Sequence, residues 1–282
     1  MDTKLIAYSA LPNRFEDKRY LAIEDCARKN GYSVVHISMG DLRAFTAAGV
    51  KRDDILLTWT VHRGPKEEMA KAFTKQGGRV VVCEEGYFRI VNGQKCFSMA
   101  IGDHNGAGHW NIGGPDRWDS FGISLEPWRA DRDDSYILVS EQRGIGSVKM
   151  ASPARWHETT LKRIKDITSR PAKIRWHPKT RIHKPDVVRQ GTEQEQLAGA
   201  HAVFTWNSAL AVHALAAGIP VFYEAPHFVA AEACLRDIRM IEQPLMDDEL
   251  RLKAMQKLAW AQWRRSEIEN GEALSHLLRR PE

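Results

Sequence analysis

Two adjacent carboxylates stand where an enzyme could place a general base. Glu84 and Glu85 follow the apolar run at residues 79–83 (RVVVC). Carboxylates at the end of a buried strand must be solvated or paired, and a neighbouring carboxylate with partial burial raises a carboxyl pKa toward neutrality. Such a group can take a proton from a hydroxyl. The structural alternative is an ion pair with Arg79 or Arg89.

His177, which has cationic residues on both sides, is a second candidate for a functional site. His177 follows a short strand-like run at residues 173–176, and Pro178 favours an extended backbone at His177. Arg175 and Lys179 lie within two residues of it. This combination suits binding of a phosphate leaving group, and the alternative is a surface loop with scattered charge.

A third feature is a helix start that could hold an anion. Asn207 or Ser208 can cap an Ala-rich helix predicted over residues 208–217, and Gly218 suits its end. Free amides at a helix start bind phosphate, and open α/β sheets bind nucleotides where strand ends meet such a start. The loop at residues 141–147 (EQRGIGS) could also wrap a phosphate, although a plain turn explains it equally well.

The stretch at residues 88–132 is rich in Gly, Asn, Asp and Trp, and we expect it to be a packed loop region that shapes a cleft. Trp110 and Trp118 are its best candidates for ligand contact. The His and Asp residues of this stretch fit no common zinc spacing, so we expect no metal site.

Composition sets wide limits on function. The chain has 282 residues, a net charge of +5 and a pI near 9.0, which favours an anionic partner. Its four cysteines are scattered, without metal or redox spacing, so reduced thiols and a cytoplasmic location are expected. Neither a signal peptide nor an apolar run of about 20 residues is apparent.

Alternating strand and helix patterns predict an α/β fold in two halves, at residues 1–130 and 131–282. Predicted strands cover residues 4–8, 33–37, 55–59, 79–84, 135–140, 173–176, 202–205 and 221–223. Predicted helices cover residues 16–29, 66–75, 153–168, 193–197, 208–217, 247–268 and 272–278.

Three motifs now occur in order: EEGYFR from residue 84 with Asn105-Gly106 downstream, WHP from residue 176, and NSALAVHALAAGIPVFY from residue 207. This order resembles the capsular-polysaccharide synthesis family, which includes Kdo transferases, and the wider bacterial sialyltransferase-like group. The resemblance implies the GT-B architecture, in which two Rossmann-like domains face each other across a cleft. The chain departs from the family in its shorter length and in having Glu at both acidic positions, which leaves the identity of the base open between Glu84 and Glu85.

The resemblance implies a glycosyltransferase that acts by single displacement, without a metal or a cofactor, on a UDP- or CMP-linked sugar. One of the two glutamates would deprotonate the acceptor, His177 would contact the donor phosphate, and Glu224 would take a ribose or sugar hydroxyl. The last helix would cross back onto the first domain. The expected donor-binding residues are Arg143, Gly144, Arg175, Lys179, Thr205, Asn207, Ser208, Ala209 and Glu224. The expected acceptor-binding residues are Asn13, Arg89, Asn105, His109, Trp110 and Trp118.

Two acceptors remain open at this point. One is a capsular or other surface polysaccharide, and the other is a hydroxymethylated pyrimidine in DNA, as for bacteriophage DNA-modification glycosyltransferases. Basic charge and interleaved aromatic and cationic residues favour DNA slightly, because base extrusion needs stacking beside phosphate-binding cations. A non-catalytic relative that binds a nucleotide or glycan is a third possibility.

Overall fold

The computed structural model describes residues 5–12, 18–37, 41, 49–61, 64–129, 134–177 and 191–279. Its chain divides into two compact units. Unit 1 contains residues 1–121, 146–148 and 257–282, and unit 2 contains residues 122–145 and 149–256. Each unit is built on one mainly parallel sheet, which confirms the mixed α/β class. The predicted facing of two domains across a cleft stays a prediction.

Unit 1 has a six-stranded sheet in the order β10-β5-β4-β3-β1-β2. Parallel pairing joins β1 to β2 and β3, and β3 to β4, whereas β5 is antiparallel to both β4 and β10. The strands are β1 (Leu5–Ser9), β2 (Tyr32–His36), β3 (Ile55–Trp59), β4 (Arg79–Val91), β5 (Gln94–Ile101) and β10 (Gln262–Arg264). The helices are α1 (Lys18–Lys29), α2 (Pro65–Lys75), α3 (Asp116–Asp119), α9 (Arg265–Glu269) and α10 (Glu272–Leu278), with a 3₁₀ turn η2 at Asn105–Ala107.

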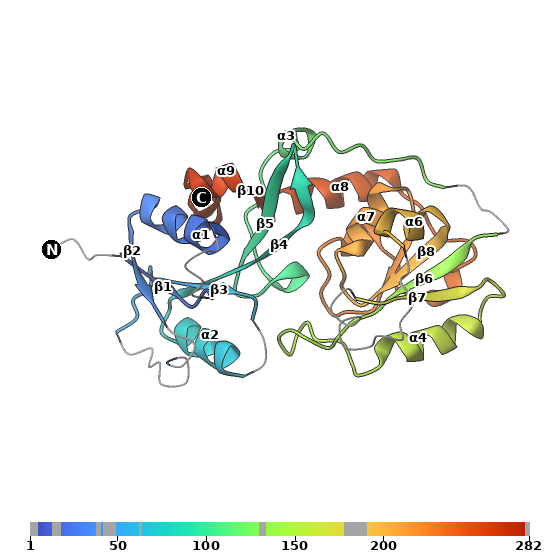
Figure 1. The fold of residues 1–282 in the computed structure, drawn as a ribbon, viewed down its shortest axis with the longest axis horizontal. Coiled ribbons are helices and arrows are strands. Elements are labelled where there is room, and N and C mark those ends of the chain that lie inside the picture. Colours follow the sequence, from blue (N-terminus) through green and yellow to red (C-terminus); the bar gives the residue numbers. More distant parts are fainter. Residues whose placement is uncertain are drawn as a thin grey trace. The chain divides into compact units, whose positions relative to one another are not determined.

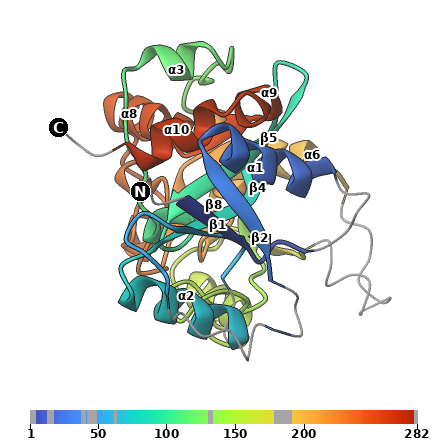
Figure 2. The ribbon, with the colours of Figure 1, turned by 90° about the vertical axis from the view of Figure 1, so that its left-hand side faces the viewer.

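Helices cover both faces of this sheet (Figures 1 and 2). On one face, α1, α9 and α10 pack over a core that includes Ile23, Phe97 and Trp263. On the other face, α2 packs through Met69 and Phe73. Helices on both faces explain why β3 is almost uniformly apolar, as expected for a strand buried on both sides.

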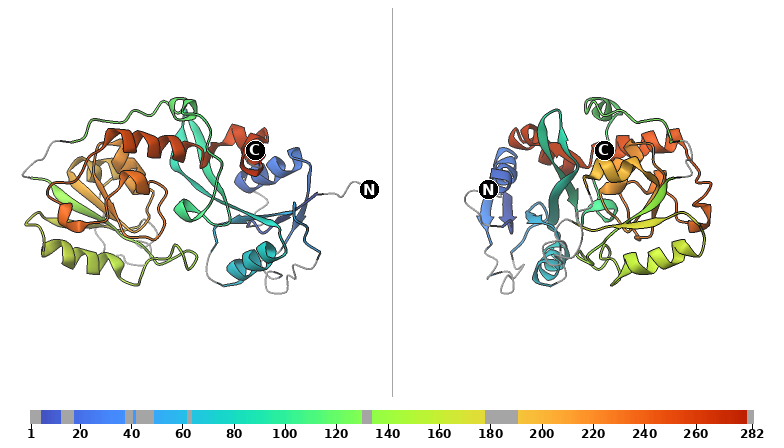
Figure 3. Two further views of the ribbon diagram at one scale, coloured as in Figure 1. Left: turned by 180° about the vertical axis from the view of Figure 1, so that it is seen from behind. Right: turned by 45° about the vertical axis from the view of Figure 1, so that its right-hand side comes forward.

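Unit 2 has a four-stranded parallel sheet in the order β7-β6-β8-β9. Figure 3 shows α4 on one face of this sheet, where Trp156 and Ile164 pack against Ile137 and Phe204. The strands are β6 (Tyr136–Ser140), β7 (Ala172–Arg175), β8 (Ala200–Thr205) and β9 (Val221–Tyr223). The helices are α4 (Trp156–Lys165), α6 (Glu193–Ala198) and α7 (Leu210–Ala216), with 3₁₀ turns η3 (Ala231–Ala233) and η4 (Ile238–Met240). Helix α8 (Asp248–Ala259) leads from unit 2 back to unit 1.

The strand–helix alternation predicted from the sequence is confirmed for most elements, and two stretches differ from it in the type of element. Residues 88–101 are not irregular: β4 continues to Val91 and forms a hairpin with β5. The turn is Asn92-Gly93, both residues with positive φ, which is a strong hairpin signal. The helix predicted over residues 247–268 stops at Ala259, because Trp263 is buried on a short strand that pairs with β5.

Candidate functional site

The loop that follows β5 presents polar side chains in a fixed geometry. Asn105 adopts a left-handed backbone conformation and its Oδ1 accepts a hydrogen bond from the Gly106 amide at 2.9 Å. The chain then turns back, so that the His109 amide donates to the carbonyl of Ile101 at 3.0 Å. Gly108 makes this close approach possible, since a Cβ there would lie 2.3 Å from the Asp103 carbonyl oxygen.

Glu84 on β4 lies beside this loop. Its Oε1 is 4.0 Å from Nε2 of His104, and its side chain keeps 30% exposure to solvent. Glu84 is therefore a carboxylate that a ligand can reach and that also has a histidine neighbour.

His104 connects Glu84 to a second, more deeply buried carboxylate. Its Nδ1 lies 2.9 Å from Oδ1 of Asp103, and the two side chains form an ion pair. The two groups are not aligned as a hydrogen bond. The same Oδ1 accepts the His104 amide at 2.9 Å, and Asp103 Oδ2 accepts the Ser147 hydroxyl at 2.7 Å. Glu84, His104, Asp103 and Ser147, which we call the Glu84 network, thus form one continuous set of contacts within unit 1.

The electrostatics of the Glu84 network follow from burial and charge. Burial raises the pKa of Glu84, and although the His104 charge lowers it, Asp103 and Glu85 raise it further. Burial also works against the charged forms of Asp103 and His104, but their mutual contact and the Ser147 hydrogen bond outweigh it. The pKa of Asp103 is therefore lowered and that of His104 raised, so the contact favours the ionised form of both residues.

Glu85 has a different environment from Glu84. Successive side chains on a strand point to opposite faces, and Glu85 meets Arg19 of α1, with Oε1 at 2.7 Å from Nη1. Its side chain is 48% exposed. The Arg19 guanidinium also lies over the rings of Tyr20 and Trp59. The sequence suggested an ion pair with Arg79 or Arg89 as the structural alternative to a general base. Glu85 does form an ion pair, but its partner is Arg19.

The predicted acceptor-binding residues lie in several places. Asn105 is in the loop beside the Glu84 network, and its backbone contacts the buried Tyr87 hydroxyl. Arg89 and His109 are exposed, and Asn13 lies outside the described residues. Trp110 donates its indole N–H to the Lys257 carbonyl at 3.0 Å, and Trp118 is buried against Phe88 and Phe121. Both tryptophans therefore contribute to packing within unit 1.

In unit 2, the carboxyl ends of β6 and β7 are tied together by Glu141. Its carboxylate accepts the His177 amide at 2.7 Å, and its own amide donates to the Arg175 carbonyl at 2.8 Å. At the end of β8, the side chains of Trp206 and Asn207 both donate to the Met150 carbonyl. The loop after β6 and the turn after β8 therefore meet at the point where the strand order reverses, which is where open parallel sheets bind ligands.

Several predicted donor-binding residues already have partners in unit 2. The Ser208 amide donates to Thr205 Oγ1 at 2.8 Å, and α7 begins at Leu210, beyond Ala209, which corrects the predicted helix start at Ser208. Arg175 contacts Gln196 and Glu193 of α6.

Glu224 accepts hydrogen bonds from Trp156 Nε1 at 2.6 Å and from Arg163. Arg143 and Gly144 are exposed, and Lys179 lies outside the described residues.

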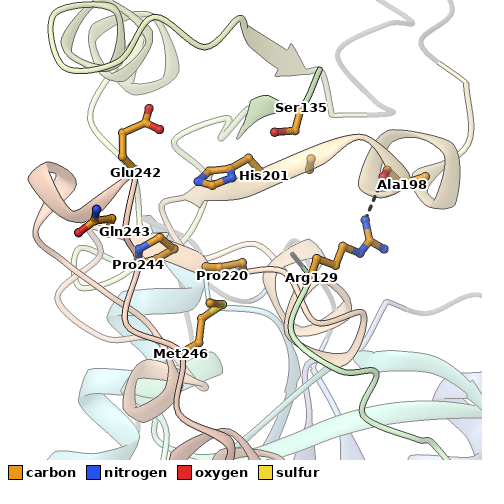
Figure 4. Close-up of a pocket in the computed structure, with 10 residues that line it drawn as sticks. Arg129, Ser135, Ala198, His201, Pro220, Glu242, Gln243, Pro244 and Met246 are labelled. Carbon is orange, nitrogen blue, oxygen red and sulfur yellow. Dashed lines mark hydrogen bonds between the residues drawn. The ribbon is translucent and has the colours of Figure 1, made fainter. Parts of the chain in front are cut away.

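A separate cavity of about 310 Å³ lies near the amino ends of β6, β8 and β9 (Figure 4). Two polar side chains of its lining already have partners: Arg129 donates to the carbonyls of Leu197 and Ala198, and His201 Nε2 lies 2.8 Å from the Ile241 carbonyl. This cavity is at the end of the sheet opposite to the predicted donor-binding residues.

The described ranges contain neither a metal-binding cluster nor a helix that could span a membrane. His, Cys, Asp and Glu side chains there do not form a group of three that could hold a metal ion. No helix among the same residues is long and apolar enough to cross a bilayer. Metal independence stays a prediction.

Sequence reasoning missed the roles of Asp103, His104 and Glu141 in these contacts. A signal for the first two was present in the Asn92-Gly93 turn. Recognition of that hairpin places the end of β5 beside β4, because Ile101 pairs with Val81. The polar pair directly after β5 then lies beside β4, and the turn of the loop back to Ile101, which the strand pairing does not predict, places His104 near Glu84.

No protein-family model matches the chain, and the search of curated proteins finds no match. Two solved structures of KpsC from Thermosulfurimonas dismutans are similar to it in fold. The β-Kdo 2,7-transferase is 14% identical with a TM-score of 0.58, over 96% of this chain and 99% of that one. The β-Kdo 2,4-transferase is 12% identical with a TM-score of 0.54, over 90% of each chain. The predicted resemblance is thus confirmed at the level of the fold, which this chain shares with Kdo transferases over nearly its whole length.

Proposed function

We propose that this protein is a glycosyltransferase that moves a sugar from a nucleotide-sugar donor to a hydroxyl group of a glycan. The observation that carries the proposal is the fold similarity to a Kdo transferase over 96% of the chain. Glu84 supplies a group with suitable chemistry, since it is a reachable carboxylate whose pKa burial raises.

The proposed reaction is a single displacement. The acceptor hydroxyl gives its proton to the Glu84 carboxylate, and its oxygen forms a new bond to the anomeric carbon. The bond between that carbon and the donor phosphate oxygen breaks, and its electron pair leaves with the nucleotide. Ordinary general-base catalysis contributes about 10²- to 10⁴-fold to such a step.

For the donor, we propose the carboxyl ends of β6, β7 and β8 in unit 2. Support comes from the contact between Glu141 and the His177 backbone, which fixes His177 at this edge of the sheet. The loop with Arg143 and Gly144 follows β6 at the same edge and is exposed. A glycine-containing loop with an exposed cation suits a phosphate, and His177 is the proposed contact to it.

For the acceptor, we now prefer a surface glycan to DNA. Both similar structures are Kdo transferases, and this supports the polysaccharide alternative. Basic charge was one of the arguments for DNA, and an anionic sugar nucleotide also accounts for it.

The test is a thermal-shift panel of UDP-, CMP-, GDP- and ADP-sugars, with Kdo activated by CMP among them. A donor at about 100 times its Kd stabilises the folded protein by about 2.7 kcal/mol, so its melting temperature must rise. Donors that bind are then offered with surface-glycan acceptors and, separately, with hydroxymethylated duplex DNA. Transfer to glycan supports the proposal, transfer to DNA alone overturns the acceptor, and a panel without binding or transfer overturns the function.

A further inference from the structure

The Glu84 network contains two residues that the proposed reaction does not yet use. We propose that Asp103 and His104 are positioning residues for Glu84: Asp103 holds His104 as a cation, and this cation keeps the Glu84 carboxylate ionised and fixed as the base for sugar transfer. The inference rests on the proposed function, because Glu84 is the base only if the protein transfers a sugar.

The imidazole ring of His104 lies between two carboxylates. One ring nitrogen of His104 lies 2.9 Å from Asp103, and the other lies 4.0 Å from Glu84. A neutral imidazole carries one N–H, so its other nitrogen would present a lone pair to a carboxylate. The doubly protonated ring instead places positive charge beside both carboxylates, at ion-pair distances of 2.9 and 4.0 Å.

Burial gives these contacts their strength. The side chains of His104 and Asp103 are only 13% and 9% exposed, so solvent screens the charges weakly. Asp103 is also held by the His104 amide and the Ser147 hydroxyl, which donate to different oxygens of its carboxylate. The cation is therefore anchored on the side away from Glu84.

The charge balance around Glu84 shows why a cation is needed there. Asp103 lies beyond His104, and Glu85, Tyr87 and Cys83 are on the same strand as Glu84. Each of these groups is neutral or negative, and burial already disfavours the Glu84 carboxylate. Among the described residues, His104 is the cation whose charge lowers the Glu84 pKa, so its loss should raise that pKa.

The first experiment measures the coupling without any assay of activity. Histidine-selective NMR follows the ring pKa of His104, assigned by loss of its signal in His104→Gln. We expect a pKa above 6.5 in the native protein, lower in Glu84→Gln and lower again in Asp103→Asn. A His104 pKa at or below 6.5 that neither substitution changes would overturn the proposal.

The second experiment measures the pH profile of kcat/KM for sugar transfer. Activity requires ionised Glu84, so it falls as pH decreases through the Glu84 pKa. In His104→Gln the acid limb should move to higher pH by about 1 to 3 units, with recovery of the rate above the new pKa. His36→Gln, which changes an exposed histidine on β2, is the matched control and should leave the profile unchanged.

The outcomes separate the two ideas. If His104→Gln lowers the rate equally at every pH and the acid limb of the pH profile does not move, His104 has only a structural role. This result overturns the inference. If the native protein transfers no sugar, the proposed function falls, whereas the NMR titration still decides whether His104 and Glu84 are coupled. Coupling together with a displaced limb supports the inference.

Discussion

Glu84 and Glu85 are neighbours in sequence with different surroundings. Glu84 lies beside a buried histidine, whereas Glu85 forms an ion pair with Arg19 on the face covered by α1. Strand alternation imposes this separation, because adjacent side chains leave a strand in opposite directions. An identical pair of residues can therefore provide one base and one surface ion pair.

This difference predicts distinct effects for two matched substitutions. Glu84→Gln should lower kcat by about 10²-fold or more, since it removes the base, and should leave donor affinity unchanged. Glu85→Gln loses an exposed ion pair, so it should cost at most about 1 kcal/mol of stability and little activity. Steady-state kinetics and donor calorimetry on both variants make the comparison. Equal turnover in Glu84→Gln and the native protein would refute the assignment of the base.

A buried ion pair in unit 1 makes a second prediction at the residue scale. Arg117 Nη1 lies 2.9 Å from Glu267, its Nε and Nη2 donate to main-chain carbonyls, and its guanidinium lies 4.0 Å from the Trp263 ring centre. Arg117→Met leaves the buried Glu267 without this partner and should cost about 3 to 5 kcal/mol in urea unfolding. Arg265→Met removes an exposed pair with Glu269 and should cost about 1 kcal/mol or less.

The same pair gives unit 1 a pH dependence with a defined sign. Burial raises the pKa of Glu267, but hydrogen bonds from Arg264 and Arg117 outweigh it, so the folded-state pKa is lowered. The stabilisation is therefore present above the unfolded pKa, about 4.3, and is lost as pH falls through the folded value. Urea unfolding from pH 7 to pH 3 should show this loss in the native protein and a weaker one in Glu267→Gln. Parallel curves for the two proteins would contradict it.

At the scale of elements, the turn between α7 and β9 depends on one glycine. Gly218 has a φ of +70°, as the sequence predicts for a residue that follows a helix, and a Cβ there would lie 2.0 Å from the Pro127 carbonyl oxygen. Gly93 in the β4–β5 turn has a similar φ of +72° but open space around it. A comparison of substitutions at the two positions therefore separates the energetic cost of backbone strain from that of steric overlap.

Gly218→Ala should therefore destabilise its surroundings more than Gly93→Ala. Both variants incur left-handed backbone strain of about 1 to 2 kcal/mol, and only the first adds an overlap of about 1 to 3 kcal/mol. Hydrogen exchange of the α7 and β9 amides, compared with that of the β4 and β5 amides, measures each local cost. Equal costs at the two sites would mean that the Pro127 segment moves aside freely.

Element types were predictable from the sequence, whereas the contacts between elements were less so. Periodicity and capping placed β1 to β4, β6 to β9 and most helices, because these depend on local pattern. The strand at Gln262–Arg264 was missed, since Trp263 and its neighbours continue a helical spacing and only pairing with β5 makes them a strand. The role of His104 was missed for a similar reason, because it depends on contact with Glu84, which lies 20 positions away in the chain.

At the scale of the whole molecule, unit 1 is discontinuous in sequence. The segment at residues 257–282 belongs to it, and Trp263, Ile268, Leu274 and Leu277 are buried in its core. Lys29, the last residue of α1, donates to the main-chain carbonyl of Glu269, and Asn30 in the turn after it donates to that of Gly271. Unit 1 therefore needs a segment that the chain supplies only after unit 2 is complete.

Ending the chain after Ala259 should consequently unfold unit 1 and leave unit 2 folded. Hydrogen-exchange mass spectrometry should show protection lost in β1 to β5 and retained in β6 to β9. Two full-length variants provide the matched test, because Trp263→Ala and Trp156→Ala each remove one buried tryptophan, from unit 1 and unit 2 respectively, at about 3 to 5 kcal/mol. Each should lower protection in its own unit alone. If either variant lowers protection evenly from β1 to β10, the two units unfold together as one cooperative structure.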